Sequence, residues 1–438
     1  MSDNRIPTEV ELVYELMPCN AMRVAQEAVQ KEKHACAYFR QWGTYNSYDY
    51  AKPGAPLERG INQKCTYVGR AAMLPEMLSG CRKTPILAVG INPNLPGWWT
   101  KTRSWMNPDF DDYKQYAHYF RYREVSKLAM PIDEYTKVGG PAEPNPFDDV
   151  ELNVPLDPEG LRSISMEEQA QGMYRTYQGI LDDFAKEMGW NDHNLVVGED
   201  LAYANMVACP SAKWTTKANP DDPNLPPMTN RQRDGILDEC FDERRYFLRQ
   251  LFQSLPSVIL VFSQSTANAL IGALKGRFSA GNPQPGEPVT KLIERDIRLH
   301  YGEAGGTVLD AIVLFAPHPT GDPQNWKIAR PKFMQRMAQL GASGRLKLNP
   351  ETKHLARTAG SCTFCTMLEI GKCDYLNEIV PLETPPELMA APAPSEAPDK
   401  PVQNAMMEAF HADLQRERSG WDLADDAVNT DSAKNIGE

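Results

Sequence analysis

Short apolar runs alternate with longer amphipathic segments along the middle of the chain. Four runs have the length and the flanking Gly, Pro or polar residues of buried strands, namely residues 85–90, 201–209, 258–263 and 309–316. Apolar positions at three- and four-residue spacing predict helices at residues 11–40, 165–188, 231–254, 265–274 and 332–340. Strands that alternate with helices indicate a parallel sheet covered on both faces. We therefore expect a three-layer α/β/α sandwich with a central, mostly parallel four-stranded sheet.

Three of the expected strands run directly into polar turns that contain proline. These turns are Gly90-Ile91-Asn92-Pro93, residues 205–210 and Pro317-His318-Pro319-Thr320. Ligands of parallel α/β sheets bind beyond the carboxyl ends of the strands, so the turns predict an active site. Asn92 offers a donor and an acceptor, although it could simply cap its turn. His318 can donate to an oxyanion, although it could also be an ordinary loop histidine.

The chain of 438 residues suits one large domain with additions. We expect four segments: a helical N-terminal extension over residues 1–60, an α/β core over 61–345, a Cys-rich segment over 346–384 and an acidic tail over 385–438. A polar, aromatic and proline-rich stretch at about 107–158 is interpreted as an insertion in the core. The tail has the composition of a segment without fixed structure, apart from one possible short helix at 403–418.

The net charge is −12 at pH 7, but its distribution matters more than its sum. Acidic residues gather in the tail, so a local basic surface elsewhere could still bind phosphates. Basic clusters lie at Lys101 and Arg103, at Arg244, Arg245 and Arg249, and at Lys327, Arg330, Lys332 and Arg336. For the cluster around Arg244 we expect an ordinary solvated helix face. No apolar run approaches the roughly 20 residues that cross a bilayer, and no signal-peptide pattern is present, so we expect a cytoplasmic monomer without a membrane partner.

The order of these motifs resembles the uracil-DNA-glycosylase superfamily. The closest match is its single-strand-selective monofunctional branch, and the mismatch-specific branch is second. That branch has a Gly-x-Asn-Pro turn and a His-Pro-Ser turn, which here read Gly90-Ile91-Asn92-Pro93 and His318-Pro319-Thr320. Residues 205–210 resemble its Asn-bearing middle strand, and residues 231–270 resemble the long helix, strand and small-residue helix that follow. The resemblance covers about residues 60–345, and four motifs in one order are more specific than each alone.

The resemblance implies a monofunctional DNA glycosylase, which flips a base out of DNA and hydrolyses its N-glycosidic bond to leave an abasic site. Asn92 would position the attacking water, His318 would stabilise the charge of the departing base, and Asn205 would read the amide edge of a pyrimidine. Trp105 would stack on the flipped base, with Trp98 and Trp99 as alternatives. Gly90, Ile91 and Asn94 would also line the base site. The residues expected to contact or hold open the DNA are Thr320, Gln324, Asn325, Trp326, Lys327 and Arg330.

Departures from the family pattern leave the substrate open. Asn94 stands where the family turn usually has Gly, and Thr320 replaces Ser. The base is uracil or a 5-substituted pyrimidine in one interpretation, with a role in DNA repair. In a second, the enzyme attacks hypermodified bases of viral DNA in antiviral defence. A non-catalytic DNA-binding member of the fold and an enzyme on free nucleosides or nucleotides are further alternatives.

Nine cysteines favour thiols or metal ligands over disulfides in a chain expected to be intracellular. Cys362, Cys365 and Cys373 form the densest group, whose C-x2-C start is typical of zinc and iron–sulfur sites, and nearby His354 would suit zinc. The iron–sulfur branch of the superfamily has ligands at places that the resemblance puts at Cys209 and Cys240. Its N-terminal C-x2-C is missing, and the C-terminal pair could replace it. The cofactor would be a 4Fe–4S cluster or zinc; alternatively, Cys209 and Cys240 are small buried hydrophobic residues.

Overall fold

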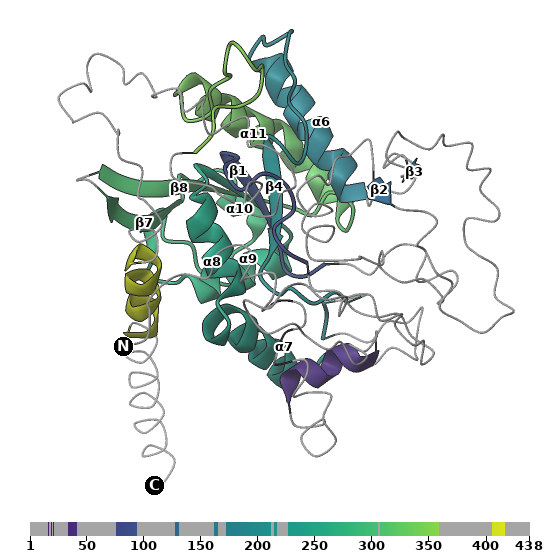
Figure 1. Cartoon of the computed structure of the whole chain (residues 1–438), viewed down its shortest axis with the longest axis vertical. Coiled ribbons are helices and arrows are strands. Elements are labelled where there is room, and N and C mark those ends of the chain that lie inside the picture. Colours follow the sequence, from purple (N-terminus) through teal and green to yellow (C-terminus); the bar gives the residue numbers. More distant parts are fainter. Residues whose placement is uncertain are drawn as a thin grey trace, which may run out of the picture.

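The fold is built on a six-stranded sheet with the strand order β4-β1-β5-β8-β7-β6 (Figure 1). The computed structural model describes residues 16, 19, 21, 34–41, 76–93, 128–130, 162–164, 172–211, 214–216, 227–304, 307–358 and 405–416. The strands are β1 (Ile86–Gly90), β4 (Leu201–Asn205), β5 (Val258–Phe262), β6 (Phe278–Ala280), β7 (Arg298–Ala304) and β8 (Thr307–Ala316). A separate antiparallel pair joins β2 (Leu128–Met130) to β3 (Arg162–Ile164).

The four strands expected from the apolar runs are present, adjacent and parallel, in the order β4-β1-β5-β8. The expected number of strands was wrong, because β7 and β6 extend the sheet in the antiparallel direction. In β7, Leu299 and Tyr301 are buried while Glu303 is exposed. Such a strand is buried on one face only, so it lacks the continuous apolar run that marks a central parallel strand.

Helices cover both faces of the sheet, as expected for a three-layer α/β/α arrangement (Figure 1). The helices α6 (Gly172–Glu187) and α11 (Pro323–Ala342) pack on the face that carries Ile86 and Ala88. The helices α8 (Tyr246–Ser254), α9 (Gln264–Ala273) and α10 (Val289–Leu292) pack on the face that carries Leu87 and Val89. Alternate residues of one strand therefore enter two separate cores.

The segment expected as one helix at 231–254 is broken into three parts. α7 (Asn230–Leu237) starts with a capping box between Thr229 and Gln232 and passes into the π-helical turn η3 (Asp238–Glu243). α8 begins after Arg245, whose φ of 57° is left-handed. The 3-10 helix η1 (Ala35–Gln41) packs on α7 so closely that a Cβ on Gly235 would lie 2.9 Å from the Cβ of Ala35. Among the described residues, no helix has the length and apolar character needed to span a membrane.

A helix of residues 405–416 packs against the core beside β7, within the range where the sequence suggests a short helix (Figure 1). The ring centroid of Phe410 lies 5.2 Å from that of Phe252, and the Arg277 guanidinium lies 4.5 Å from the Phe410 centroid. Arg277 also pairs with Asp413 at 3.0 Å. This part of the expected unstructured tail is therefore an ordered element of the α8–α9 layer.

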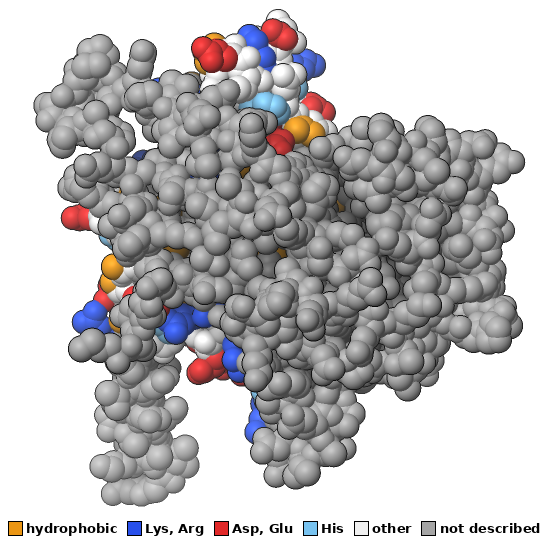
Figure 2. Space-filling view, viewed as in Figure 1, with side chains coloured by type: hydrophobic (Ala, Val, Ile, Leu, Met, Phe, Trp, Pro, Cys, Tyr) orange, Lys and Arg blue, Asp and Glu red, His pale blue; other side chains and the backbone are white. Residues whose placement is uncertain are grey.

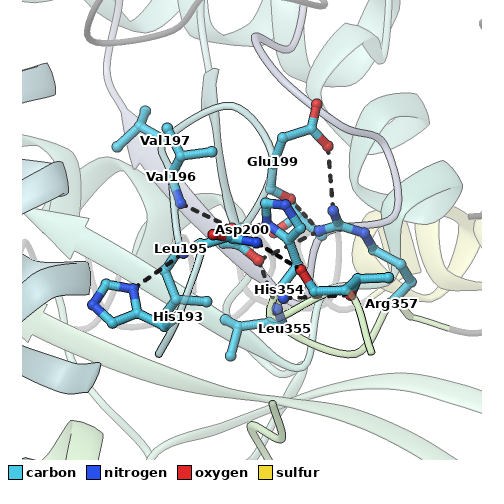
Figure 3. A network of polar contacts seen from close by, with 12 residues as sticks. His193, Leu195, Val196, Val197, Glu199, Asp200, His354, Leu355 and Arg357 are labelled. Carbon is cyan, nitrogen blue, oxygen red and sulfur yellow. Dashed lines mark hydrogen bonds and ion pairs between the residues drawn. The ribbon is translucent and has the colours of Figure 1, made fainter. Parts of the chain in front are cut away.

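The buried carboxylate of Asp200 fastens the chain after α11 to the loop that precedes β4 (Figure 3). Its oxygens accept hydrogen bonds from the backbone N–H of Val196 at 2.9 Å and of Leu355 at 2.6 Å. Nδ1 of His354 lies 2.8 Å from Asp200 Oδ2. His354, considered above as a zinc ligand, is therefore engaged in a structural contact at the amino end of β4.

We expect the substitution Asp200→Ala to lower the free energy of unfolding by about 3–5 kcal/mol, since it leaves the buried N–H of Leu355, the partly buried N–H of Val196 and the ring of His354 without their acceptor. Urea unfolding followed by circular dichroism measures the change. Asp192→Ala is the matched control, because Asp192 is 89 % exposed and its loss should change stability by no more than about 0.5 kcal/mol. Equal effects of the two substitutions would contradict the structural role of Asp200.

We expect Phe410→Ala to destabilise the protein by about 3–5 kcal/mol, because it removes a buried ring from between Phe252 and Arg277. The same unfolding measurement applies. Arg416→Ala, at a side chain that is 76 % exposed on the same helix, is expected to be neutral within about 0.5 kcal/mol. A neutral Phe410→Ala would show that the helix does not stay docked in solution.

Candidate active site

The carboxyl ends of the four parallel strands bring the predicted turns to one edge of the sheet. Gly90 is paired with Asn205 across β1 and β4, and Phe262 with Ala316 across β5 and β8. The turns after β1 and β8 are separated by β5, hence by two strand spacings, or about 10 Å. The sheet order thus puts the Asn92 and His318 turns within the span of one bound nucleotide.

The Asn92 turn is fastened to the chain that follows β4. Backbone N–H groups of Met206, Val207 and Ser211 donate to the carbonyls of residues 90, 91 and 93 at 2.9–3.0 Å. Asn92 is buried, and its Nδ2 donates to Ser211 Oγ at 2.7 Å and to the Cys209 carbonyl at 3.4 Å. All hydrogen bonds described for this side chain use Nδ2, so Oδ1 is the atom that can accept one from a water.

Asn205 is buried and its amide is oriented by two neighbours. Tyr203 Oη donates to Asn205 Oδ1 at 2.7 Å, and Asn205 Nδ2 lies 3.5 Å from Glu76 Oε2. A Cβ on Gly90 would lie 2.1 Å from Tyr203 Oη and 2.5 Å from Asn205 Oδ1, so this arrangement requires glycine at residue 90. Glu76 was not foreseen, because only the fold brings it to Asn205 across 129 residues of sequence.

The ring of His318 has one defined protonation pattern. Backbone N–H groups point at Nδ1 from Gly321 at 2.9 Å and from Thr320 at 3.3 Å. Nδ1 is therefore an acceptor, and in the neutral ring the proton is on Nε2. Partial burial lowers the pKa of His318 below its usual value, which favours this neutral form at physiological pH.

A pocket of about 450 Å³ lies beside His318. The residues that line it come from the turn after β5, from the region of α10 and from the turn before α11; they are Ser263, Gln264, Pro288, Val289, Thr290, Pro317, His318, Gly321, Asp322 and Asn325. Neither Asn92 nor Asn205 is among them. Ser263 is the N-cap of α9 and has a φ of 93°. It follows an apolar strand directly, and this position in the sequence could have predicted that Ser263 lines the pocket.

The residues expected to contact DNA lie mainly on the first turns of α11. Gln324, Asn325 and Lys327 are exposed, as is Thr320 in the preceding turn. Trp326 packs instead against Phe262 and Phe333, with ring centroids 5.7 and 5.5 Å away. Its contacts fasten α11 to the sheet.

The basic cluster on α11 is largely matched by acidic side chains. Arg330 pairs with Asp183 of α6, and Lys332 pairs with Glu294. The second cluster is matched too, since Arg244 pairs with Glu239, and Arg245 with Glu408. On the face shown in Figure 2, the described Lys and Arg side chains are interspersed with Asp and Glu side chains. Of the basic residues expected at the DNA, Lys327 has no ion pair among the described residues.

Several predicted residues lie outside the described part of the chain. They are Asn94, Trp98, Trp99, Lys101, Arg103, Trp105, Cys362, Cys365 and Cys373. Cys209 and Cys240 are buried, and burial raises the pKa of the Cys240 thiol well above its usual value, against a smaller lowering effect of the Ala208 backbone. Within the described ranges, no group of three or more His, Cys, Asp or Glu side chains is arranged to hold a metal ion.

Comparison with models of known protein families gives no match to this chain, and comparison with curated proteins gives no significant match either. The chemistry of the site is therefore argued from its own residues.

We expect His318 to titrate below the value of about 6.5 that is typical of an unperturbed histidine, because burial disfavours the imidazolium. The unfolded chain then binds more protons than the folded one between the two pKa values. Consequently the contribution of His318 to the free energy of unfolding decreases as the pH falls from about 6.5 to the folded pKa. Below the folded pKa this contribution no longer changes with pH. NMR titration of the histidine ring protons, assigned with His318→Gln, measures the folded pKa. A value at or above 6.5 would contradict the neutral ring.

Proposed function

We propose that the protein is a monofunctional DNA glycosylase that removes uracil or a 5-substituted pyrimidine and leaves an abasic site. The observation that carries the proposal is His318, whose Nδ1 accepts backbone hydrogen bonds at the edge of a pocket beyond the strand ends. This arrangement presents the Nε2 proton as a donor.

A fixed neutral donor suits the departure of a base. When the N-glycosidic bond breaks, the electron pair goes to the base, and negative charge develops on its carbonyl oxygen. An N–H group already oriented toward that oxygen stabilises the charge without reorganisation in the transition state. Gln264 in the pocket is the first residue of α9, so the positive end of that helix dipole adds to the effect.

The two asparagines supply the remaining parts of the reaction. Asn92 Oδ1 would accept a hydrogen bond from the water that attacks the sugar, while its Nδ2 remains bonded to Ser211. Asn205 would read the amide edge of the base through the free hydrogen-bonding capacity of its Oδ1 and Nδ2. Tyr203 gives Asn205 one orientation, which is the condition for distinguishing donor from acceptor on a base.

The reaction is proposed to end with the abasic site. No lysine is among the described residues that line the pocket, so no amine is available there to form a Schiff base with the opened sugar. In this proposal the partner is DNA, contacted by the exposed residues Thr320, Gln324, Asn325 and Lys327 and by the neighbouring Arg330. A cytoplasmic, monomeric enzyme remains our prediction.

A second candidate substrate is a hypermodified base of viral DNA, which would make the enzyme part of a defence system. The size of the pocket, about 450 Å³, favours it, because this is more room than a bare pyrimidine ring fills. The same residues would carry the same bond cleavage, so only the substrate differs.

The test is incubation of the purified protein with uracil-containing DNA and with modified viral DNA, followed by alkali to break abasic sites. We expect cleavage on at least one substrate and a 10²–10³-fold lower rate in His318→Ala, the usual effect of losing an oxyanion donor. His300→Ala is the matched control, because His300 faces Asp310 near the opposite edge of the sheet. It should retain the full rate.

Other outcomes identify the alternatives. If the protein binds DNA without forming any abasic product, and His318→Ala binds DNA equally well, the protein is a non-catalytic DNA-binding member of the fold. If the protein releases bases from free nucleosides or nucleotides but not from DNA, its substrates are nucleosides or nucleotides.

A further inference from the structure

Ser263, which links β5 to α9, has a backbone conformation that serine rarely adopts. Its φ is 93° and its ψ is 149°, in a region that is used almost only by glycine, because a Cβ there meets the neighbouring backbone. The other described non-glycine residues with positive φ have values of 61° or below. The backbone of Ser263 is therefore strained, and this strain lowers the stability of the folded chain.

The capping role of Ser263 does not explain why this residue is a serine. Its Oγ accepts a hydrogen bond from the backbone N–H of Thr266 at 3.1 Å, which makes Ser263 the N-cap of α9. Glycine is almost as good an N-cap as serine, and the difference between them is several times smaller than the strain of a non-glycine residue in this conformation. Folding alone would thus favour glycine at residue 263.

The position of Ser263 is at the middle of the candidate active site. It follows β5, which lies between β1 and β8 in the sheet. Its backbone N–H donates to the carbonyl of Ala316 at 3.0 Å, two residues before His318. Ser263 and His318 also line the same pocket. The strained residue therefore lies between the turn of Asn92 and the turn of His318.

Hydrogen bonds from Thr266 direct the hydroxyl proton of Ser263. Thr266 is 2 % exposed, and its Oγ1 lies 2.9 Å from Ser263 Oγ; no other hydrogen bond of this Thr266 hydroxyl joins described residues. Because a buried hydroxyl requires an acceptor for its proton, Thr266 Oγ1 donates to Ser263 Oγ. With the Thr266 N–H, both acceptor sites of Ser263 are then used, and its own proton can donate into the pocket.

The charge of the pocket indicates which kind of group enters it. Its described lining contains no Lys or Arg, but it does contain the carboxylate of Asp322, whose Oδ2 accepts from Asn325 Nδ2 at 2.9 Å. A phosphate, which is charged before any reaction, is repelled by such a lining. A neutral group with acceptor oxygens, such as the carbonyl of a base, is compatible with it.

We propose that Ser263 is a second catalytic hydrogen-bond donor, which acts beside His318 on the carbonyl oxygen of the departing base. The inference rests on the proposed glycosylase function. When the N-glycosidic bond breaks, the electron pair goes to the base, and the protons stay on Ser263 Oγ and His318 Nε2. Two oriented donors stabilise the developing charge more than one does, and the strain at Ser263 is the cost of holding the second donor in place.

The protonation of His318 distinguishes this role from that of a nucleophile. Nδ1 of His318 accepts backbone hydrogen bonds, and in the neutral ring Nε2 carries the proton. The ring therefore has no free acceptor to take a proton from Ser263, and a serine without such a base is a weak nucleophile. We accordingly expect no covalent intermediate on Ser263.

The first measurement is thermal unfolding of the full chain without substrate. Ser263→Ala keeps the strain and loses the cap, so its melting temperature should fall by about 2–4 °C. Ser263→Gly removes the strain together with the hydroxyl, so it should melt at or above the temperature of the wild type. Ser265→Ala is the matched control, because Ser265 is an exposed residue of α9 outside the pocket lining. Its melting temperature should stay within about 1 °C of the wild type.

The second measurement is the rate of base release from the DNA substrate that the wild type cleaves. We expect Ser263→Gly and Ser263→Ala to lower kcat about tenfold or more and to change KM less, since the donor acts mainly on charge that develops in the transition state. Ser265→Ala should keep the full rate. Ser263→Gly would thus be a variant that is as stable as the wild type or more so, and yet slower.

Each contrary outcome has a defined meaning. A full rate in Ser263→Gly would overturn the inference and leave the glycosylase function intact. A melting temperature of Ser263→Gly as low as that of Ser263→Ala would overturn the strain on which the inference depends. Absence of abasic product with the wild type would overturn the proposed function, and this inference with it. If Ser263→Ala does not fold, Ser263→Gly alone decides the rate test.

Discussion

Strand β1 pairs in parallel with β4 on one side and with β5 on the other, and the remaining structure depends on this pairing. Its residues 86–89 are buried, alternately in the α6–α11 layer and in the α8–α9 layer. Since parallel strands share one direction, the turns after β1, β4 and β8 must meet at one edge. The burial of β1 on both faces places it in the centre of the sheet, and its parallel pairing then determines where the candidate site lies.

The residues of that edge have structural and chemical tasks at once. Asn92 uses Nδ2 to fasten two turns, which fixes the place of Oδ1. His318 uses Nδ1 to close its own turn, which fixes the proton on Nε2. In both cases a local hydrogen bond removes one degree of freedom from a polar group, and such preorganisation is what stabilises charge that develops during a reaction.

The segment from Asn205 to Ser211 carries several groups of the candidate active site. It carries the amide proposed to read the base, and also the Cys209 carbonyl and the Ser211 hydroxyl, which both accept hydrogen bonds from Asn92. These hydrogen bonds join the turn after β1 to the chain that follows β4.

The sequence by itself determined the central parallel strands and the two proline-bounded turns. A strand buried on both faces must be apolar at every position, and a turn must carry residues with suitable backbone conformations, so both are encoded locally. The tertiary structure alone decided the rest: the half-buried strand β7, the break at η3, the contact of Glu76 with Asn205 and the pocket at Ser263. Some of these features join residues that are far apart in the chain, and β7 is buried on one face only. Neither situation produces a recognisable pattern in consecutive residues.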